Sequence, residues 1–395
     1  MIPPFNFARI PNVIFGPGKL KELFEIIPKF GNNLLFVIGK NSLKASGKWE
    51  EILAASNHKS YNYSTVSIAG EPSPDLIDDS SVKFRKKNID IVISIGGGSV
   101  TDAGKAISAM ITKKDSIKNY LEGIGSKVHN GEKVPFIAIP TTSGTGSEAT
   151  KNAVISEIGP NGFKKSLRHE NLIPDIAIID PELMLSCPSS ISASCGMDAF
   201  TQLLEAYVSP RGNPITDSLA FSGMKFISEN ILKASSTGSS DVNVRAAMAY
   251  GSLLSGITLA NAGLGIVHGL ASPIGGFFDI PHGVVCGTLL SEATKRNIMK
   301  LQKSGVDGRK ALRKYAQVGA LVTGKPLDKN DDIDKYCSNL IFTLDEWTKQ
   351  LGLERLGKYG ITQDDIDKIV NKTGIKNNPV DLDNEDISTI IINRL

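Results

Sequence analysis

The chain has 395 residues, of which 41% are hydrophobic and 22% charged, and its formal net charge is +3. This length and composition are typical of a globular protein with two or three domains and a sizeable core. The charge is too small for this length to indicate nucleic-acid binding, and no run of about 20 apolar residues indicates a membrane span.

The N-terminus and the cysteines favour a cytoplasmic protein. No basic segment followed by a long apolar run opens the chain, so no signal peptide is predicted. Cys187 and Cys195 are close enough in sequence to pair. Free thiols are the expectation for all four cysteines, because no C-x-x-C spacing occurs.

The first half of the chain alternates short apolar runs with helical patterns. Continuous runs rich in Ile and Val predict buried parallel strands at 33–39, 89–98, 134–140 and 174–180. A helical pattern at 73–88 precedes the second of them. This alternation predicts an α/β domain with a parallel sheet over residues 1–184.

A glycine-rich turn follows the second predicted strand. Gly96, Gly97 and Gly98 allow the backbone to turn sharply and to approach a ligand closely. Ser99 is expected to cap the next helix, with Asp102 three residues later, and the exposed amides there favour a phosphate. The alternative is a tight turn without a ligand, since neither G-x-G-x-x-G nor a Walker loop is present.

A hydroxyl-rich segment, PTTSGTGSEAT, follows the third predicted strand. It offers the side chains of Thr141, Thr142, Ser143, Thr145 and Ser147. Two such loops at strand ends predict a nucleotide cradle, and a polar surface turn is the alternative.

After Pro181 the strand signal fades. Helical periodicity predicts helices at 215–235, 241–262, 286–301 and 362–374, the last opening with a Thr362–Asp365 capping pattern and closing at Gly374. The expected second domain is therefore all-α and covers residues 185–395. No low-complexity linker separates the halves, so a ligand cleft between them is expected.

Three residues of the second half suggest a metal site. His268 lies in a small-residue helix, and His282 follows Pro281 near a helix start. With Asp198 they make a set suited to a divalent metal, although each histidine alone has a structural alternative. Gln202 stands one helical turn after Asp198, on the same face.

Several blocks of this sequence, in order and almost from end to end, resemble the iron-containing (group III) alcohol dehydrogenases, which have the dehydroquinate synthase-like fold. The blocks are NVIFGPG, GGGSVTDAGK, PTTSGTGSEAT, AIIDPELM, GMDAF, VHGLASPIGG and IPHG. The resemblance implies an N-terminal NAD(P)-binding domain, a helical metal and substrate domain, and hydride transfer to or from a small alcohol or aldehyde. It also implies a homo-oligomer, a dimer or larger.

The resemblance implies roles for individual positions. Gly97, Gly98, Ser99 and Asp102 are expected to hold the pyrophosphate and nicotinamide side of the cofactor. The phosphates and ribose of the cofactor are expected to contact Thr141, Thr142, Thr145 and Ser147. Lys164 is also expected to reach a ribose. The metal ligands, and hence the catalytic residues, are Asp198, His268 and His282, with Gln202 at the fourth position.

Two departures from the family pattern affect this assignment. Gln202 replaces a histidine, so its amide oxygen or a water is expected at the metal, and Zn²⁺ becomes as consistent as Fe²⁺. Ser272 replaces a further histidine, so the proton is expected to leave through water or a ribose hydroxyl. A metal-independent reductase similar to the maleylacetate reductases, a dehydroquinate synthase-type enzyme and a nucleotide-binding protein without turnover are the alternatives.

The end of the predicted strand at 33–39 indicates which cofactor is preferred. An acidic residue at this end would favour NAD, but the position holds Gly39, followed by Lys40, Asn41 and Ser42. We therefore expect NAD or NADP, with a slight preference for NADP. Segments 70–75 and 275–283 are expected to line the pocket, with Phe277 and Phe278 on its apolar side.

Overall fold

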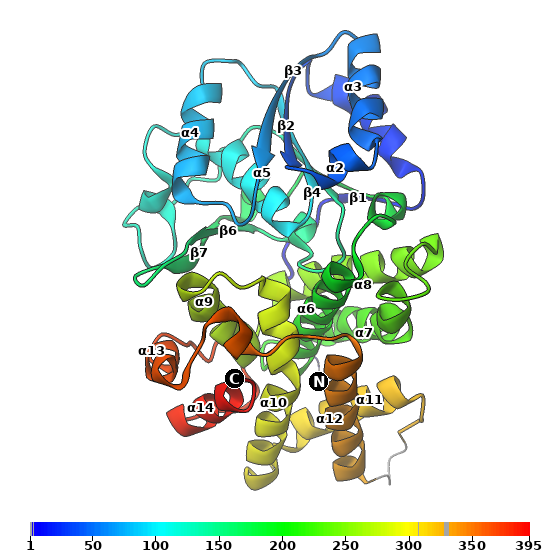
Figure 1. Ribbon diagram of the computed structural model, residues 1–395, viewed down its shortest axis with the longest axis vertical. Helices are drawn as coiled ribbons and strands as arrows, with labels where there is room; N and C mark the ends of the chain where they lie inside the picture. Colours follow the sequence, from blue (N-terminus) through cyan, green and yellow to red (C-terminus); the bar gives the residue numbers. More distant parts are fainter. Residues whose placement is uncertain (1, 3, 307, 328–331) are drawn as a thin grey trace.

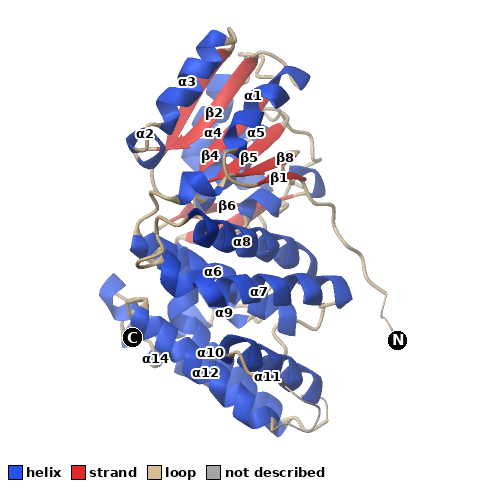
Figure 2. Ribbon diagram, turned by 90° about the vertical axis from the view of Figure 1, so that its right-hand side faces the viewer, coloured by secondary structure: helices blue, strands red, loops and turns tan. Residues whose placement is uncertain are grey.

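The computed structural model describes residues 2, 4–306, 308–327 and 332–395. Its first half holds a six-stranded, all-parallel sheet, and its second half is helical (Figure 1, Figure 2). The strand order is β1-β8-β5-β4-β2-β3, with bounds Asn12–Phe15 (β1), Asn33–Gly39 (β2), Asn62–Ile68 (β3), Ile91–Gly96 (β4), Phe136–Pro140 (β5) and Ile176–Ile179 (β8). The predicted fold class is confirmed, and each of the four predicted strands is present.

Side chains of the central strands alternate between two helical layers. Leu34, Phe36 and Ile38 pack toward α1 (Leu23–Ile26) and α3 (Lys48–His58), whereas Leu35 and Val37 pack toward α4 (Pro74–Phe84) and α5 (Gly98–Met110). Because α3 follows β2 on one face and α5 follows β4 on the other, the winding reverses between these neighbouring strands. Open α/β sheets bind ligands at the carboxyl ends of the strands at such a point.

Two strands outside the main sheet form an antiparallel hairpin, β6 (Asn152–Glu157) and β7 (Phe163–Arg168). The hairpin lies between the sheet and the helical half, beside α9 (Figure 1). Neither this hairpin nor the edge strands β1 and β3 were predicted. These strands are only partly buried and therefore lack a continuous apolar run.

The helical half is built around α6, which is buried along most of its length and packs against α7, α8 and α10. Its helices are α6 (Ser189–Val208), α7 (Pro214–Ala234), α8 (Val242–Ala262), α9 (Ile266–Phe277), α10 (His282–Lys303), α11 (Arg309–Thr323), α12 (Ile333–Gln350), α13 (Ile366–Val370) and α14 (Asn384–Ile392). The predictions for α7 and α8 agree within one residue at each end, and α10 extends beyond its predicted range. The helices α6, α9 and α10 supply the site described below.

The predicted helix at 362–374 is too long. The Thr362–Asp365 capping box is present, but α13 ends at Val370 rather than near Gly374. Asn371 and Lys372 are exposed, so the buried apolar stripe that supports the helix stops there.

Between β8 and α6 the chain makes a short 3₁₀ turn, Pro181–Met184. A domain boundary near residue 184 stays a prediction. Within the ranges given above, no single helix is long and apolar enough to cross a membrane. The α8 and α9 helices meet the condition on length and apolar composition only when they are taken together, and the pair is bent by 100°.

Candidate active site

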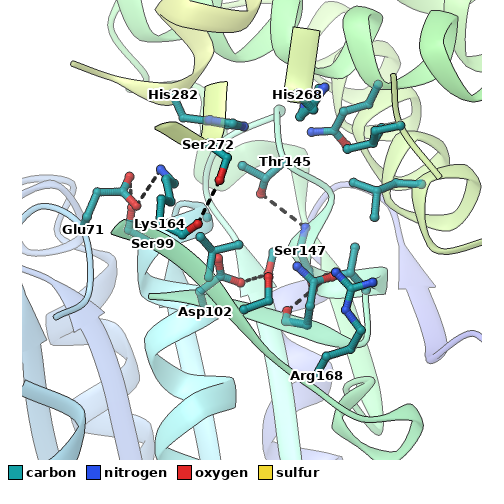
Figure 3. A pocket seen from close by; sticks show the side chains of 18 of the residues that line it. Glu71, Ser99, Asp102, Thr145, Ser147, Lys164, Arg168, His268, Ser272 and His282 are labelled. Carbon is teal, nitrogen blue, oxygen red and sulfur yellow. Dashed lines mark hydrogen bonds and ion pairs between the residues drawn. The ribbon is translucent and has the colours of Figure 1, made fainter. Parts of the chain in front are cut away.

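A pocket of about 900 Å³, part of it open to solvent, lies where the two halves of the chain meet. Its walls come from the first turns of α5, from the loop after β5, from the β6–β7 hairpin and from α6, α8, α9 and α10 (Figure 3). Nine of the predicted site residues line it: Gly98, Ser99, Asp102, Thr145, Ser147, Lys164, Gln202, His268 and His282. Its apolar wall comes from Leu259 and Leu264.

The expectation for Phe277 and Phe278 was wrong. These rings are absent from the pocket lining and pack against the helical core instead. Segment 70–75 contributes Glu71 to the wall, as predicted.

The two loops of the predicted nucleotide cradle meet at Gly98. A methyl group on Gly98 would lie 2.7 Å from Thr145 Cγ2 and Oγ1, so only glycine permits this approach. The prediction that Ser99 caps α5 was wrong. The N-cap is Gly97, and Ser99, inside the first turn, donates from Oγ to Glu71 Oε1 at 3.3 Å.

The loop after β5 is anchored on both sides. Gly146 has a left-handed φ of 59°, and a Cβ there would lie 2.5 Å from the backbone nitrogen of Gly256 on α8. On the sheet side, the buried Lys105 donates to the carbonyl oxygens of Ser147, Thr150 and Asn152 at 2.8–2.9 Å. The loop is therefore fixed between α5 and the helical half.

Lys164 projects from β7 into the pocket. Its Nζ pairs with Glu71 Oε2 at 3.0 Å, and its carbonyl accepts a hydrogen bond from Ser272 Oγ at 3.0 Å. Burial raises the pKa of Glu71, but the Lys164 ammonium more than offsets this and lowers it below the ordinary value. The ion pair holds Lys164 at the pocket wall.

Four of the predicted site residues lie at the carboxyl ends of the strands, outside this pocket. Gly39 ends β2, Gly97 precedes α5, and Thr141 and Thr142 follow β5 directly. The amide of Thr141 donates to the Gly96 carbonyl, and a Cβ on Gly97 would lie 3.2 Å from Thr142 Oγ1. These residues thus extend the cradle along the carboxyl ends of the strands.

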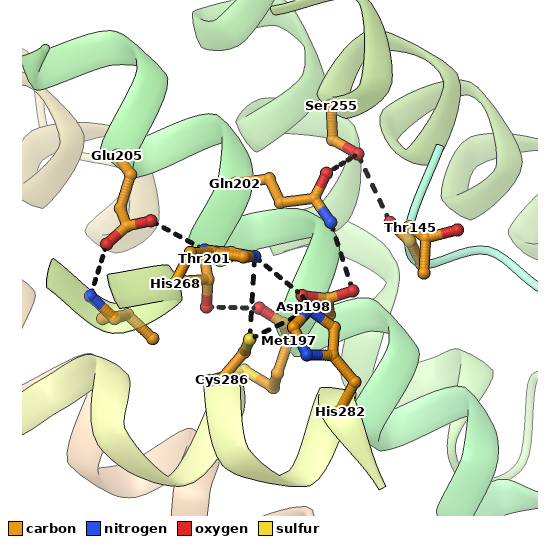
Figure 4. A network of polar contacts seen from close by, with 12 residues as sticks. Thr145, Met197, Asp198, Thr201, Gln202, Glu205, Ser255, His268, His282 and Cys286 are labelled. Carbon is orange, nitrogen blue, oxygen red and sulfur yellow. Dashed lines mark hydrogen bonds and ion pairs between the residues drawn. The ribbon is translucent and has the colours of Figure 1, made fainter. Parts of the chain in front are cut away.

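Asp198, His268 and His282 come together from α6, α9 and α10 (Figure 4). Asp198 Oδ1 lies 3.3 Å from His268 Nε2 and 3.7 Å from His282 Nε2. This oxygen is buried and has no hydrogen-bond partner among the described residues. A buried carboxylate oxygen facing two imidazole nitrogens fits a divalent cation, and burial without one is costly.

Glu205 orients His268 from behind. His268 Nδ1 lies 2.7 Å from Glu205 Oε2, and the Val267 amide donates to Glu205 Oε1 at 2.7 Å. A carboxylate on Nδ1 leaves Nε2 free to face a metal, the usual carboxylate–histidine–metal arrangement. Burial opposes a charge on His268, yet Cys286, Glu205 and Asp198 raise its pKa well above the ordinary value.

Gln202 contacts Asp198 through its amide. Its Nε2 donates to Asp198 Oδ2 at 3.2 Å, and its Oε1 accepts from Ser255 Oγ at 3.2 Å. Cys286 completes the cluster, and burial raises the pKa of its thiol to about 12 in the absence of a metal. All four cysteines are free.

Comparison with known proteins places the chain in a family. The family model described as iron-containing alcohol dehydrogenase matches residues 11–181, and the model of the family's C-terminal part matches residues 192–395. The chain belongs to the iron-containing alcohol dehydrogenase family. Its general class is therefore that of an oxidoreductase acting on alcohols.

Individual members of the iron-containing alcohol dehydrogenases agree with this placement. NAD-dependent methanol dehydrogenase of Bacillus methanolicus is 34% identical over 319 residues, 77% of this chain and 81% of the relative. The 1,3-propanediol dehydrogenase of Citrobacter freundii is 33% identical over 294 residues, 73% and 75% of the two chains. The solved structure of an alcohol dehydrogenase from Oenococcus oeni superposes with a TM-score of 0.87 at 28% identity, covering 99% of this chain and 100% of that one.

Sequence reasoning about this iron-containing alcohol dehydrogenase missed three residues: Lys105, Glu205 and Cys286. Two of them carried a signal. Glu205 lies two helical turns after Asp198, and Cys286 lies one turn after His282, so each shares a helix face with a predicted ligand. Lys105 acts through contacts with residues distant in sequence and carried none.

Proposed function

We propose that this chain is an NAD(P)-linked alcohol dehydrogenase or aldehyde reductase that holds a divalent metal through Asp198, His268 and His282. The observation that carries the proposal is the buried Asp198 Oδ1, which accepts no hydrogen bond among the described residues and faces the Nε2 atoms of both histidines beside the pocket. Loops that suit a dinucleotide form the opposite wall of that pocket.

A divalent ion at these residues supplies Lewis-acid activation of the substrate oxygen, and the nicotinamide ring supplies or accepts the hydride. The chain contributes binding and orientation. Gln202 holds the Asp198 carboxylate, and Glu205 holds the His268 ring. Leu259 and Leu264 cover the apolar part of the substrate on the helical side.

The proton needs a separate route. Ser272 stands where a relay histidine occurs in relatives, and its hydroxyl donates to the Lys164 carbonyl. A serine hydroxyl does not titrate near neutral pH, so we propose that the proton moves through water or a cofactor ribose hydroxyl.

Cofactor choice rests on the end of β2. Gly39 is followed by the exposed Lys40, Asn41 and Ser42, and none of these carries a carboxylate. No carboxylate would repel a 2′-phosphate there, and the Lys40 ammonium would attract it. We therefore propose NADP as the slightly preferred cofactor, with NAD also accepted. Lys40→Ala should raise the KM for NADPH more than the KM for NADH. An equal change in both would contradict the NADP preference.

The decisive experiment combines metal analysis with turnover. Purified wild-type protein should contain about one divalent ion per chain, and Asp198→Ala and His268→Ala should lose it together with NAD(P)H oxidation by short aldehydes. Cys337→Ala, a buried thiol distant from the site, is the matched control. Full activity in metal-free protein would favour a metal-independent reductase, and cofactor binding without turnover on any alcohol or aldehyde would favour a simple binding protein.

We also propose a homo-oligomer, a dimer or larger, on the family resemblance. Light scattering of the purified chain tests this, and a monomer at micromolar concentration would contradict it.

A further inference from the structure

Cys286 is the fully buried thiol of α10, one helical turn after His282 and therefore on the same face. Its Sγ lies 3.6 Å from His268 Nε2 and 3.6 Å from His282 Nε2. The ligand atoms of Asp198, His268, His282 and Cys286 all lie within 4.8 Å of one another. Figure 4 shows the sulfur facing the same point as the carboxylate and the two rings.

The separations between these atoms match the edges of a tetrahedral metal site. Bonds of about 2.0–2.1 Å to nitrogen or oxygen and about 2.3 Å to sulfur give edges of about 3.3 Å for N–O and about 3.6 Å for N–S pairs. The observed N–O separations are 3.3 and 3.7 Å, and both N–S separations are 3.6 Å. The sulfur thus lies at the distance from both histidine nitrogens that a fourth tetrahedral ligand requires.

Gln202, by contrast, is occupied elsewhere. Its carbonyl oxygen, the only atom of the amide that can ligate a cation, accepts from Ser255 on α8. Its nitrogen donates to the oxygen of Asp198 that faces away from the histidines. Turning Oε1 toward the cluster would break both hydrogen bonds in a buried place, which costs the desolvation penalty of each group left without a partner.

We infer that Cys286 Sγ, rather than Gln202, is the fourth protein ligand of the metal, which gives an Asp-His-His-Cys site. The inference rests on the metal site proposed above. Binding replaces the S–H bond by a sulfur–metal bond and releases the thiol proton to solvent. A thiolate with two imidazoles and one carboxylate favours Zn²⁺ over Fe²⁺. The histidines line the pocket while Asp198 and Cys286 do not, so a substrate oxygen approaches from the histidine side.

Cobalt substitution tests the ligand directly. The full chain is loaded with Co²⁺ alone, and a near-ultraviolet sulfur-to-cobalt charge-transfer band is expected in the wild type and in Gln202→Leu. Cys286→Ser should lack the band, whereas the matched control Cys337→Ser, which loses an equally buried thiol on α12, should keep it. Loss of a residue that merely orients a ligand costs about 10–100-fold in affinity, so Cys286→Ser should weaken Zn²⁺ binding by at least about 100-fold.

The outcomes separate this inference from the proposed function. Cobalt bound without the band, or with a band that persists in Cys286→Ser, would overturn the thiolate ligand and leave the metal site standing. A wild-type chain that binds no cobalt and no zinc would overturn both. If Cys286→Ser fails to fold, X-ray absorption of the zinc-loaded wild type decides, since a sulfur neighbour at about 2.3 Å is expected and its absence is contrary to the inference.

Discussion

Replacing Glu205 with Gln should weaken metal binding by forcing His268 into the wrong tautomer. The Val267 amide is a fixed donor, so the single oxygen of Gln must face it, as Glu205 Oε1 does now at 2.7 Å. The Gln nitrogen then faces His268 Nδ1, where the carboxylate oxygen stands at 2.7 Å. To accept from that nitrogen, Nδ1 must lose its proton, and the neutral ring carries the proton on Nε2 instead.

A protonated Nε2 has no lone pair for a metal, so His268 can ligate only after the Gln hydrogen bond is broken. Partners of this kind contribute about 10–100-fold to metal affinity, equivalent to about 1.4–2.7 kcal/mol. The side-chain volume hardly changes, and Glu205 is buried, with 6% of its surface exposed, so solvent is not expected to supply a replacement acceptor.

Competition with a chromophoric chelator measures the Zn²⁺ affinity of the full chain. Glu148→Gln is the matched control, because Glu148 is equally buried but lies in the loop after β5, away from the histidines. Circular dichroism confirms folding of both variants. An unchanged Zn²⁺ affinity in folded Glu205→Gln would refute the orienting role of this carboxylate.

Three further predictions concern residues away from the metal. Gly98→Ala places a methyl 2.7 Å from Thr145 and should weaken NAD(P)H binding, measured by fluorescence, by about 5–150-fold, whereas Gly374→Ala, with nothing within 4 Å, should not. Lys105→Met removes the three hydrogen bonds that the buried ammonium donates to the carbonyl oxygens of Ser147, Thr150 and Asn152, and it should lower the free energy of unfolding by about 3–5 kcal/mol in urea; an unchanged midpoint would contradict this. Burial lowers the pKa of His129 to about 4. The unfolded chain therefore binds a proton that the folded chain does not as pH falls from about 6.5 to 4, so about 3 kcal/mol of stability is lost over this window. His129→Asn should flatten that loss in urea titrations, and an identical pH slope would count against the assignment.

Burial on both faces made the central strands predictable. The runs at 33–39 and 89–98 are mostly apolar and rich in Ile, Val and Leu because β2 and β4 have neighbours on both sides and helices on both faces. β3 is an edge strand with four exposed residues, and its sequence, NYSTVSI, shows no such run. Edge strands and the β6–β7 hairpin are defined by pairing partners, which a local pattern does not contain.

For the site, as for the sheet, the sequence indicated which residues take part, but their arrangement in space came only from the structure. Asp198, His268 and His282 were predicted as ligands from their chemistry and from the family blocks around them, and the structure brings them together from three helices. Their roles stay a prediction until metal is measured. Cys286 was considered only as a free thiol, because the expected fourth ligand was sought one turn after Asp198 and not one turn after His282.

The presence of Gln202 in place of a histidine therefore also affects the contacts of Ser255 and the choice of the fourth metal ligand. Ser255 Oγ lies 3.2 Å from Gln202 Oε1 and 3.3 Å from the carbonyl oxygen of Gly144, in the loop predicted to hold the nucleotide. A histidine that faced the metal would leave Ser255 without its amide partner. With glutamine, the Gln202 amide bridges Ser255 on α8 and the Asp198 carboxylate on α6, while α10 supplies the sulfur at the fourth corner. The same substitution thus accounts for both the position of the Gln202 side chain and the need for a ligand from another helix.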